Sequence, residues 1–188
     1  MKKKQSNLAA VAIFFAIMLV IHVLSQLFFQ FFPTTIKPTL NMIPVIIASI
    51  IYGPRVGATL GFLMGLISLT HATIFLSPTS YLFTPLAPNG NLYSLMIALL
   101  PRILIGIVPY FVYKVLHNKV GLALAGASGA ITNTVFVLGG IFLLFSQVFE
   151  GDIQKVFALI ISTNSVVELL ISAVLTVSIV PALEKIRK

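Results

Sequence analysis

Residues 8–32 read LAAVAIFFAIMLVIHVLSQLFFQFF, a run of 25 residues without an Asp, Glu, Lys or Arg. A helix needs about 20 apolar residues to cross the hydrocarbon core of a bilayer, so this run is long enough to span one. Three lysines precede it, as in a secretory signal peptide, but the apolar run is much longer than the core of a signal peptide and contains no clean small-residue cleavage site. We therefore predict a retained first transmembrane helix.

The rest of the chain has the same apolar character. Of its 188 residues 59% are hydrophobic and 9% are charged, and the mean hydropathy is +1.09. A soluble domain of this size would expose too much apolar surface, whereas a membrane protein exposes it to lipid. The formal net charge is +8, but the basic residues stand at the ends of apolar runs, which favours a lipid bilayer over nucleic acid as the partner. The chain has no cysteine, which excludes disulfides and cysteine-ligated metals.

Turn residues divide the chain into six apolar segments, and we predict an all-α polytopic membrane protein with one membrane domain over residues 1–188. The predicted spans are 8–32, 39–52, 56–76, 92–113, 120–148 and 156–180. The second span would rise only about 21 Å, so we expect it to be tilted, to lie in a locally thinned bilayer, or to extend through Pro38. The predicted breaks are Gly53-Pro54-Arg55, His117-Asn118-Lys119 and Glu150-Gly151-Asp152.

The positions of the basic residues predict the orientation. In the six-span arrangement nine of them fall on one side, while only Lys37 and Lys155 fall on the other. Because basic residues accumulate on the cytoplasmic side, we expect both termini to be cytoplasmic. The nine are Lys2, Lys3, Lys4, Arg55, Lys114, Lys119, Lys185, Arg187 and Lys188.

Small residues recur every four positions on two spans and so lie on one helix face. We expect both stripes to allow close packing of neighbouring helices inside the protein. The first span has Ala9, Ala12 and Ala16, which are either more internal packing or a docking face for another membrane protein. The stripes are Gly53, Gly57, Gly61 and Gly65 on the third span, and Gly121, Ala125 and Gly129, followed by Asn133, on the fifth.

Polar side chains stand at depths where lipid makes them costly, and such residues are functional candidates. At 1.5 Å per residue, Arg102 and Glu168 lie near the midplane, and Asn164 lies one turn outward of Glu168. Asn133 and His71 lie in the middle or outer half of their spans, below the uncharged outer connection of residues 77–91. This arrangement predicts an outward-facing pocket for a small polar molecule. The sequence contains no metalloprotease, serine-hydrolase or nucleotide-binding motif, so we expect no enzyme.

Each of these residues also has a structural interpretation. Arg102 and Glu168 could neutralise each other, Asn133 and Asn164 could be hydrogen-bond partners between helices, and His71 could be a packing or loop residue. The aromatic residues Tyr81, Phe83 and Tyr93 could line a lid over the pocket or anchor the chain at the interface. Pro101 frees a backbone carbonyl one turn earlier, and such a group is tolerated at membrane depth only where a cavity or a neighbour satisfies it.

An ordered set of motifs over essentially the whole chain resembles the substrate-binding S components of energy-coupling factor (ECF) vitamin transporters. The set is most similar to the pantothenate type, and Asn41 replaces an acidic residue expected in the riboflavin type. Pyridoxine, hydroxymethylpyrimidine and riboflavin are the alternative substrates, and a self-sufficient secondary transporter is the alternative class. The motifs are Ala12-Ile-Phe-Phe-Ala16, Ile43-Pro44, residues 52–57, Phe83-Thr84-Pro85, Pro101-Arg102-Ile103-Leu104-Ile105-Gly106, Thr132-Asn133-Thr134, residues 136–140 and Ser162-Thr163-Asn164.

The resemblance implies a protein of the bacterial cell membrane that binds a vitamin from outside and has no cofactor of its own. It also implies association with a transmembrane coupling protein, through Ala12 and Ala16, and with two cytoplasmic ATPase subunits. A toppling movement would release the substrate inward. The residues expected to bind substrate are Arg102, Asn133, Asn164, Glu168, Asn41, His71, Tyr81 and Phe83.

Overall fold

The computed structural model describes residues 2–32, 38–77, 79–148, 158 and 162–187, and these residues form helices and connections without a strand. Five helical segments are long and apolar enough to cross a membrane, and a sixth apolar helix is shorter. The α-helices are α1 (Lys2–Phe31), α2 (Met42–Tyr52), α3 (Pro54–Ile74), α4 (Leu92–Ile105), α5 (Val108–Val115), α6 (Lys119–Leu144) and α8 (Thr163–Arg187), and the 3-10 helices are η1 (Ser80–Leu82) and η2 (Ser146–Val148).

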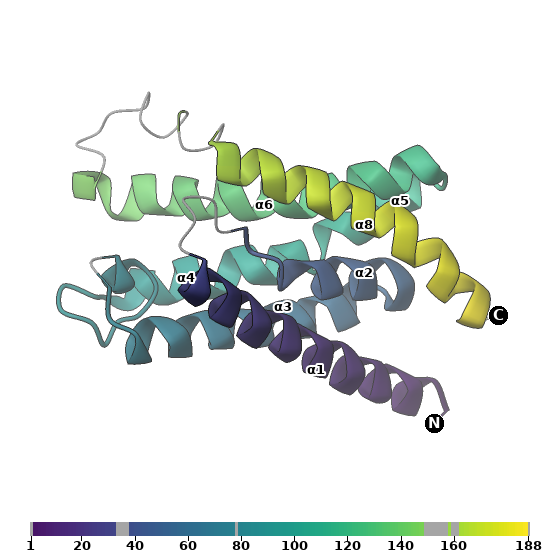
Figure 1. The fold of residues 1–188 in the computed structure, drawn as a ribbon, viewed down its shortest axis with the longest axis horizontal. Helices are drawn as coiled ribbons and strands as arrows, with labels where there is room; N and C mark the ends of the chain where they lie inside the picture. Colours follow the sequence, from purple (N-terminus) through teal and green to yellow (C-terminus); the bar gives the residue numbers. More distant parts are fainter. Residues whose placement is uncertain (1, 33–37, 78, 149–157, 159–161, 188) are drawn as a thin grey trace.

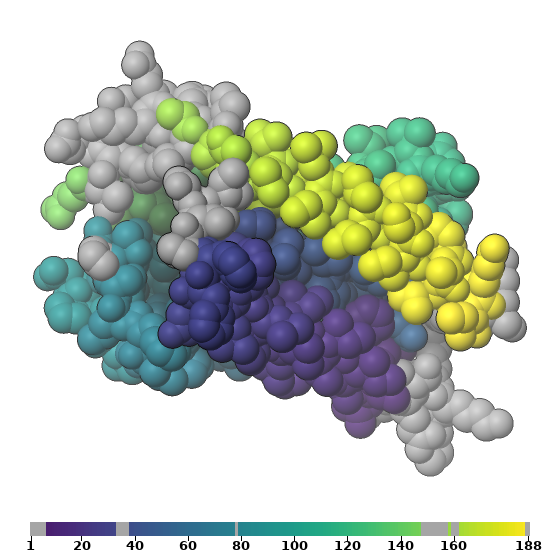
Figure 2. All heavy atoms as spheres, in the orientation of Figure 1, coloured from purple at the N-terminus to yellow at the C-terminus, as the bar shows by residue number. Residues whose placement is uncertain are grey.

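The helices lie side by side along the long axis of the molecule (Figure 1). The start of α1 and the end of α8 lie at one end of this bundle, and the connection of residues 77–91 lies at the opposite end. In the space-filling view, α1 and α8 occupy the same face of the molecule, and α2 is visible between them (Figure 2). The all-helical prediction is thus confirmed for the described residues.

The short helix α2 forms the centre of the bundle. Every residue from Met42 to Ile51 is buried, and α2 contacts α1, α3, α5, α6 and α8. Eleven residues rise only about 16 Å, which is short for a straight crossing of a hydrocarbon core. The helix in the second predicted span is buried and shorter than predicted, because it begins at Met42 rather than at Thr39.

The predicted breaks lie at helix boundaries wherever the structure describes them. Gly53, with a φ of 97°, separates α2 from α3, and this left-handed conformation is one that glycine adopts readily. Asn118 caps α6 by accepting a hydrogen bond from the Gly121 N–H at 2.8 Å. The third break, residues 150–152, and the predicted start of the sixth span lie outside the described residues. Helix α8 extends to Arg187, beyond the predicted end at Val180.

The predicted fourth span is confirmed as one apolar helical segment, Leu92–Val115, with a break between α4 and α5. Helix α4 ends at Ile105 and α5 begins at Val108, with Gly106 between them. A Cβ on Gly106 would overlap the backbone of Gly57 in α3, so the two backbone segments approach here more closely than a residue with a side chain would allow. Pro109, in the first turn of α5, fits a helix start and explains the interruption.

Both small-residue stripes are packing surfaces, as predicted, apart from Gly53, where an added Cβ would meet nothing within 4 Å. A Cβ on Gly61 would overlap the backbone carbonyl of Arg102, and one on Gly65 would press against Leu99. The stripe on α3 therefore allows α4 to approach at backbone distance and determines how close Arg102 lies to α3. The α6 stripe is buried throughout, and Gly129 lies against the side chain of Ile46 in α2.

Candidate binding cavity

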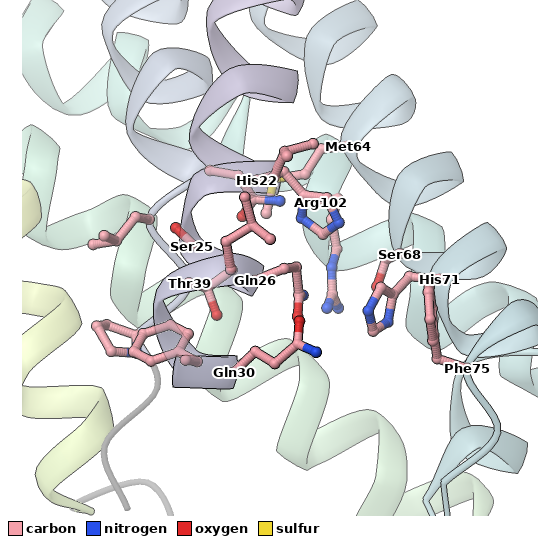
Figure 3. A pocket seen from close by; sticks show the side chains of 16 residues that line it. His22, Ser25, Gln26, Gln30, Thr39, Met64, Ser68, His71, Phe75 and Arg102 are labelled. Atoms are coloured by element: carbon pink, nitrogen blue, oxygen red, sulfur yellow. The ribbon is translucent and has the colours of Figure 1, made fainter. Parts of the chain in front are cut away.

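A cavity of about 880 Å³ lies between α1, α3, α4 and the segment that precedes α2. This volume is in the range of pockets that hold small molecules. Figure 3 shows polar side chains entering the cavity from several sides. The lining residues are His22, Val23, Ser25, Gln26, Leu27, Phe29, Gln30, Pro38, Thr39, Leu40, Asn41, Met64, Ser68, His71, Phe75 and Arg102.

Arg102 is the only lysine or arginine among the lining residues that the structure describes. Its side chain is buried, and its Nη1 donates a hydrogen bond to the carbonyl oxygen of Ile97 at 3.1 Å. This carbonyl is the one that Pro101 leaves without a helical donor, because proline has no N–H. The guanidinium of Arg102 therefore satisfies the Ile97 carbonyl that Pro101 leaves free.

The guanidinium is held on two sides. Besides the hydrogen bond to Ile97, the ring of Phe83, from the connection of residues 77–91, lies 5.5 Å from the guanidinium carbon and provides a cation–π contact. The Nε is buried and has no hydrogen-bond partner among the described residues. Arg102 also lines the cavity, so its positive charge faces an acceptor that binds there.

Glu168 has a different partner from the expected one. Its Oε1 accepts a hydrogen bond from the Thr39 N–H at 2.7 Å, a contact between residues 129 positions apart. Among the described residues Glu168 and Arg102 make no ion-pair contact, although the carboxylate attracts the guanidinium through space. Glu168 therefore holds the segment that precedes α2 in place. Thr39, Leu40 and Asn41 of this segment line the cavity.

Two histidines join α1 to α3 at the cavity. The rings of His22 and His71 meet edge to face, with centroids 5.7 Å apart, and His71 also packs on Phe75 at 4.8 Å. Because all three residues line the cavity, these contacts hold α1 against α3 at the cavity wall.

Of the residues predicted to bind substrate, Arg102, Asn41 and His71 line the cavity. Phe83 does not line it but packs against the guanidinium of Arg102. Asn133, Asn164, Glu168 and Tyr81 are not among the lining residues. The side-chain oxygens of Asn133 and Asn164 are buried and have no hydrogen-bond partner among the described residues, so they do not accept a hydrogen bond from each other. Tyr81 instead packs against Phe145, with ring centroids 5.8 Å apart.

The connection of residues 77–91 is ordered and partly buried, as predicted, apart from Pro78, which lies outside the described residues. Thr84 is buried and hydrogen-bonds to Thr73 of α3 at 2.7 Å. The hydroxyl of Ser94 donates to the Tyr81 carbonyl at 2.6 Å. Leu82 packs with Ile97 and Ile141 in a second apolar cluster, so the connection is attached to α3, α4 and α6.

The sequence prediction missed the polar residues of α1. His22, Gln26 and Gln30 recur at four-residue spacing in an otherwise apolar span, and all three line the cavity. This spacing places them on one helix face, which is a signal that could have identified the cavity wall. Thr39 and Ser68 were also missed, because isolated small hydroxyl residues are common inside membrane helices and carry no such pattern.

Comparison with known proteins establishes the family. The model of the "ECF transporter, substrate-specific component" family matches residues 6–181. The chain belongs to this family of S components. It is 47% identical over 191 aligned positions to the "Pantothenic acid transporter PanT" of Lactococcus lactis subsp. cremoris (strain MG1363), an alignment covering 99% of this chain and 97% of that protein. Both the family and this relative are transport proteins, so this S component is a transport protein with several membrane-crossing helices.

Proposed function

We propose that this S component binds pantothenate from outside the cell and delivers it inward together with an ECF coupling module. The similarity to a pantothenic acid transporter over nearly the whole chain supports the substrate. The observation that carries the proposal is the position of Arg102, a buried permanent cation that lines the cavity. Pantothenate carries one carboxylate, the anion that a guanidinium binds with charge-assisted hydrogen bonds.

The proposed orientation places the cavity outside and both termini in the cytoplasm. The cavity is lined by the C-terminal parts of α1 and α3. Figure 1 shows these parts toward the end of the bundle that carries the connection before α4, whereas the start of α1 and the end of α8 lie at the opposite end. Termini at one end require an even number of crossings, so we infer six, with α2 completing the number that five long spans leave odd. Arg55, Lys114 and Lys119 lie near helix ends on the proposed cytoplasmic side, in agreement with the positive-inside rule.

The proposed docking surface for the coupling protein is the exposed alanine face of α1. Ala12 and Ala16 are exposed, while Ala10, Phe14 and Met18 form the buried face of the same helix. Internal packing therefore does not account for the two alanines, and small exposed residues allow another helix to approach closely. ATP would be hydrolysed by the two ATPase subunits of the module.

The substrate is tested by calorimetric titration of the purified wild-type protein with pantothenate, pyridoxine, hydroxymethylpyrimidine and riboflavin. We expect tight binding of pantothenate alone. Binding of another vitamin in preference to pantothenate would contradict the proposed substrate. ATP-independent, uncoupler-sensitive uptake by the chain alone would contradict the proposed transport class.

A further inference from the structure

A row of side chains spaced four residues apart along α1 changes from apolar to polar halfway along the helix. Ala10, Phe14 and Met18, spaced four apart, are 4%, 9% and 0% exposed and face the core. The same row continues as His22, Gln26 and Gln30, which line the cavity. We call these last three residues the polar row. The row that packs α1 on the protein core thus becomes a cavity wall.

The polar row has unused hydrogen-bonding capacity. A glutamine amide offers two donors and an acceptor, and leaving them without hydrogen bonds in apolar surroundings is unfavourable. Gln26 and Gln30 are exposed rather than packed in the core, and neither makes a side-chain hydrogen bond to another described residue. Figure 3 shows both side chains reaching into the space between Thr39 and His71. Their amides are therefore open to a molecule bound in the cavity.

The cavity has two chemically different sides. Arg102, from α4, provides the cation, while the polar row provides donors and acceptors from α1, and Thr39 and Ser68 also line the cavity. His22 is already packed edge-on against His71, which leaves the two glutamines as the adaptable groups. A ligand with a carboxylate at one end and hydroxyl or amide groups along its length would satisfy both sides.

We propose that Gln26 and Gln30 bind the uncharged hydroxyl and amide groups of the ligand whose carboxylate contacts Arg102. This inference rests on the proposed function and adds to it a recognition surface on α1. It assigns the two ends of the substrate to two different helices. Helix α1 would then carry the neutral recognition surface on one face and the exposed alanines on another.

Calorimetric titration with pantothenate and with its uncharged alcohol analogue, pantothenol, separates the two sides. Both ligands carry the same hydroxyl and amide groups, so Gln26→Leu and Gln30→Leu should each weaken both ligands by the same factor, about two- to twelvefold for one lost hydrogen bond. The preference for acid over alcohol should stay at the wild-type ratio. Leu24→Ala, on an exposed position of α1 outside the cavity, is the control and should bind both ligands as wild type does.

Three outcomes overturn the inference, and thermal unfolding of each variant confirms that it is folded. Wild-type affinities in both glutamine variants would show that the polar row does not bind the ligand. A changed preference for acid over alcohol would place the glutamines at the carboxylate end instead. If wild-type protein binds neither ligand, the proposed function fails and this inference fails with it, whereas normal wild-type binding with unaltered variants overturns this inference alone.

Discussion

The guanidinium of Arg102 donates a hydrogen bond to the carbonyl oxygen of Ile97, 3.1 Å away, and so replaces the donor that Pro101 lacks. The carbonyl that lacks a helical donor in α4 thereby holds in place the side chain of Arg102, which is proposed to bind the substrate. The proline, the carbonyl and the arginine form one unit within six residues of sequence.

Pro101→Ala should weaken pantothenate binding because the new N–H can bond to the Ile97 carbonyl and displace Nη1 of Arg102. Loss of one such hydrogen bond corresponds to about 0.5–1.5 kcal/mol, or roughly two- to twelvefold in affinity measured by calorimetry. Pro181→Ala, in the interior of α8, is the matched control. Equal affinities of the Pro101 variant and wild type would show that this hydrogen bond does not position Arg102.

Glu168→Leu should destabilise the protein because it leaves the partly buried Thr39 N–H without its acceptor. The expected loss is about 1–3 kcal/mol of unfolding free energy, measured as a lowered thermal midpoint in detergent. Binding should weaken as well, because the segment of Thr39 and Asn41 lines the cavity. Glu168→Gln retains an acceptor oxygen and should recover most of the stability. A Leu variant as stable as wild type would disprove the attachment.

Gly61→Ala should lower both stability and affinity, because its methyl group would overlap the Arg102 carbonyl and push α4 away from α3. Overpacking of this kind costs about 1–3 kcal/mol. Gly139→Ala is a matched control in α6, where an added Cβ meets nothing within 4 Å and alanine favours the helix. The comparison requires thermal unfolding and calorimetry of both variants. A Gly61 variant that behaves like the Gly139 variant would contradict the close approach of α3 and α4.

Ala12→Trp and Ala16→Trp should leave pantothenate affinity unchanged and prevent assembly with the coupling protein, since both positions are exposed and lie outside the cavity. Co-purification with the coupling protein measures assembly. Leu170→Trp, on the exposed face of α8, tests whether any bulky residue on the lipid-facing surface has the same effect. Assembly of both alanine variants at the wild-type level would exclude this docking surface.

Sequence patterns predicted the fold where the physical constraint is local. Uncharged runs of about 20 residues identify membrane helices, Gly53-Pro54 defines a helix boundary, and glycines four apart predict close packing. The shortened second helix was harder to predict, because the hydropathy of α2 suits either a lipid-facing or a fully buried helix. The interruption at Gly106 has a local signal in Pro109, but the close contact of Gly106 with Gly57, 49 positions away, has none.

The candidate site was predicted only in part for a related reason. Arg102 stands out because charge is rare in a membrane helix, and Pro101 beside it pointed to an unsatisfied carbonyl. Glu168 stands out equally, yet its partner is the backbone N–H of Thr39, which no side-chain pattern reveals. The contribution of α1 was missed because its apolar residues and its alanines dominated the interpretation of the first span.

The central claim, that Arg102 binds the substrate carboxylate, is tested most directly by calorimetric titration of Arg102→Gln with pantothenate and pantothenol. A charge-assisted hydrogen bond contributes about 1.5–3 kcal/mol, so the variant should lose roughly ten- to hundredfold in affinity for the acid. It should bind the alcohol about as well as wild type does and therefore lose the preference for the acid. A folded Arg102→Gln protein that still prefers pantothenate over pantothenol as strongly as wild type would contradict the claim.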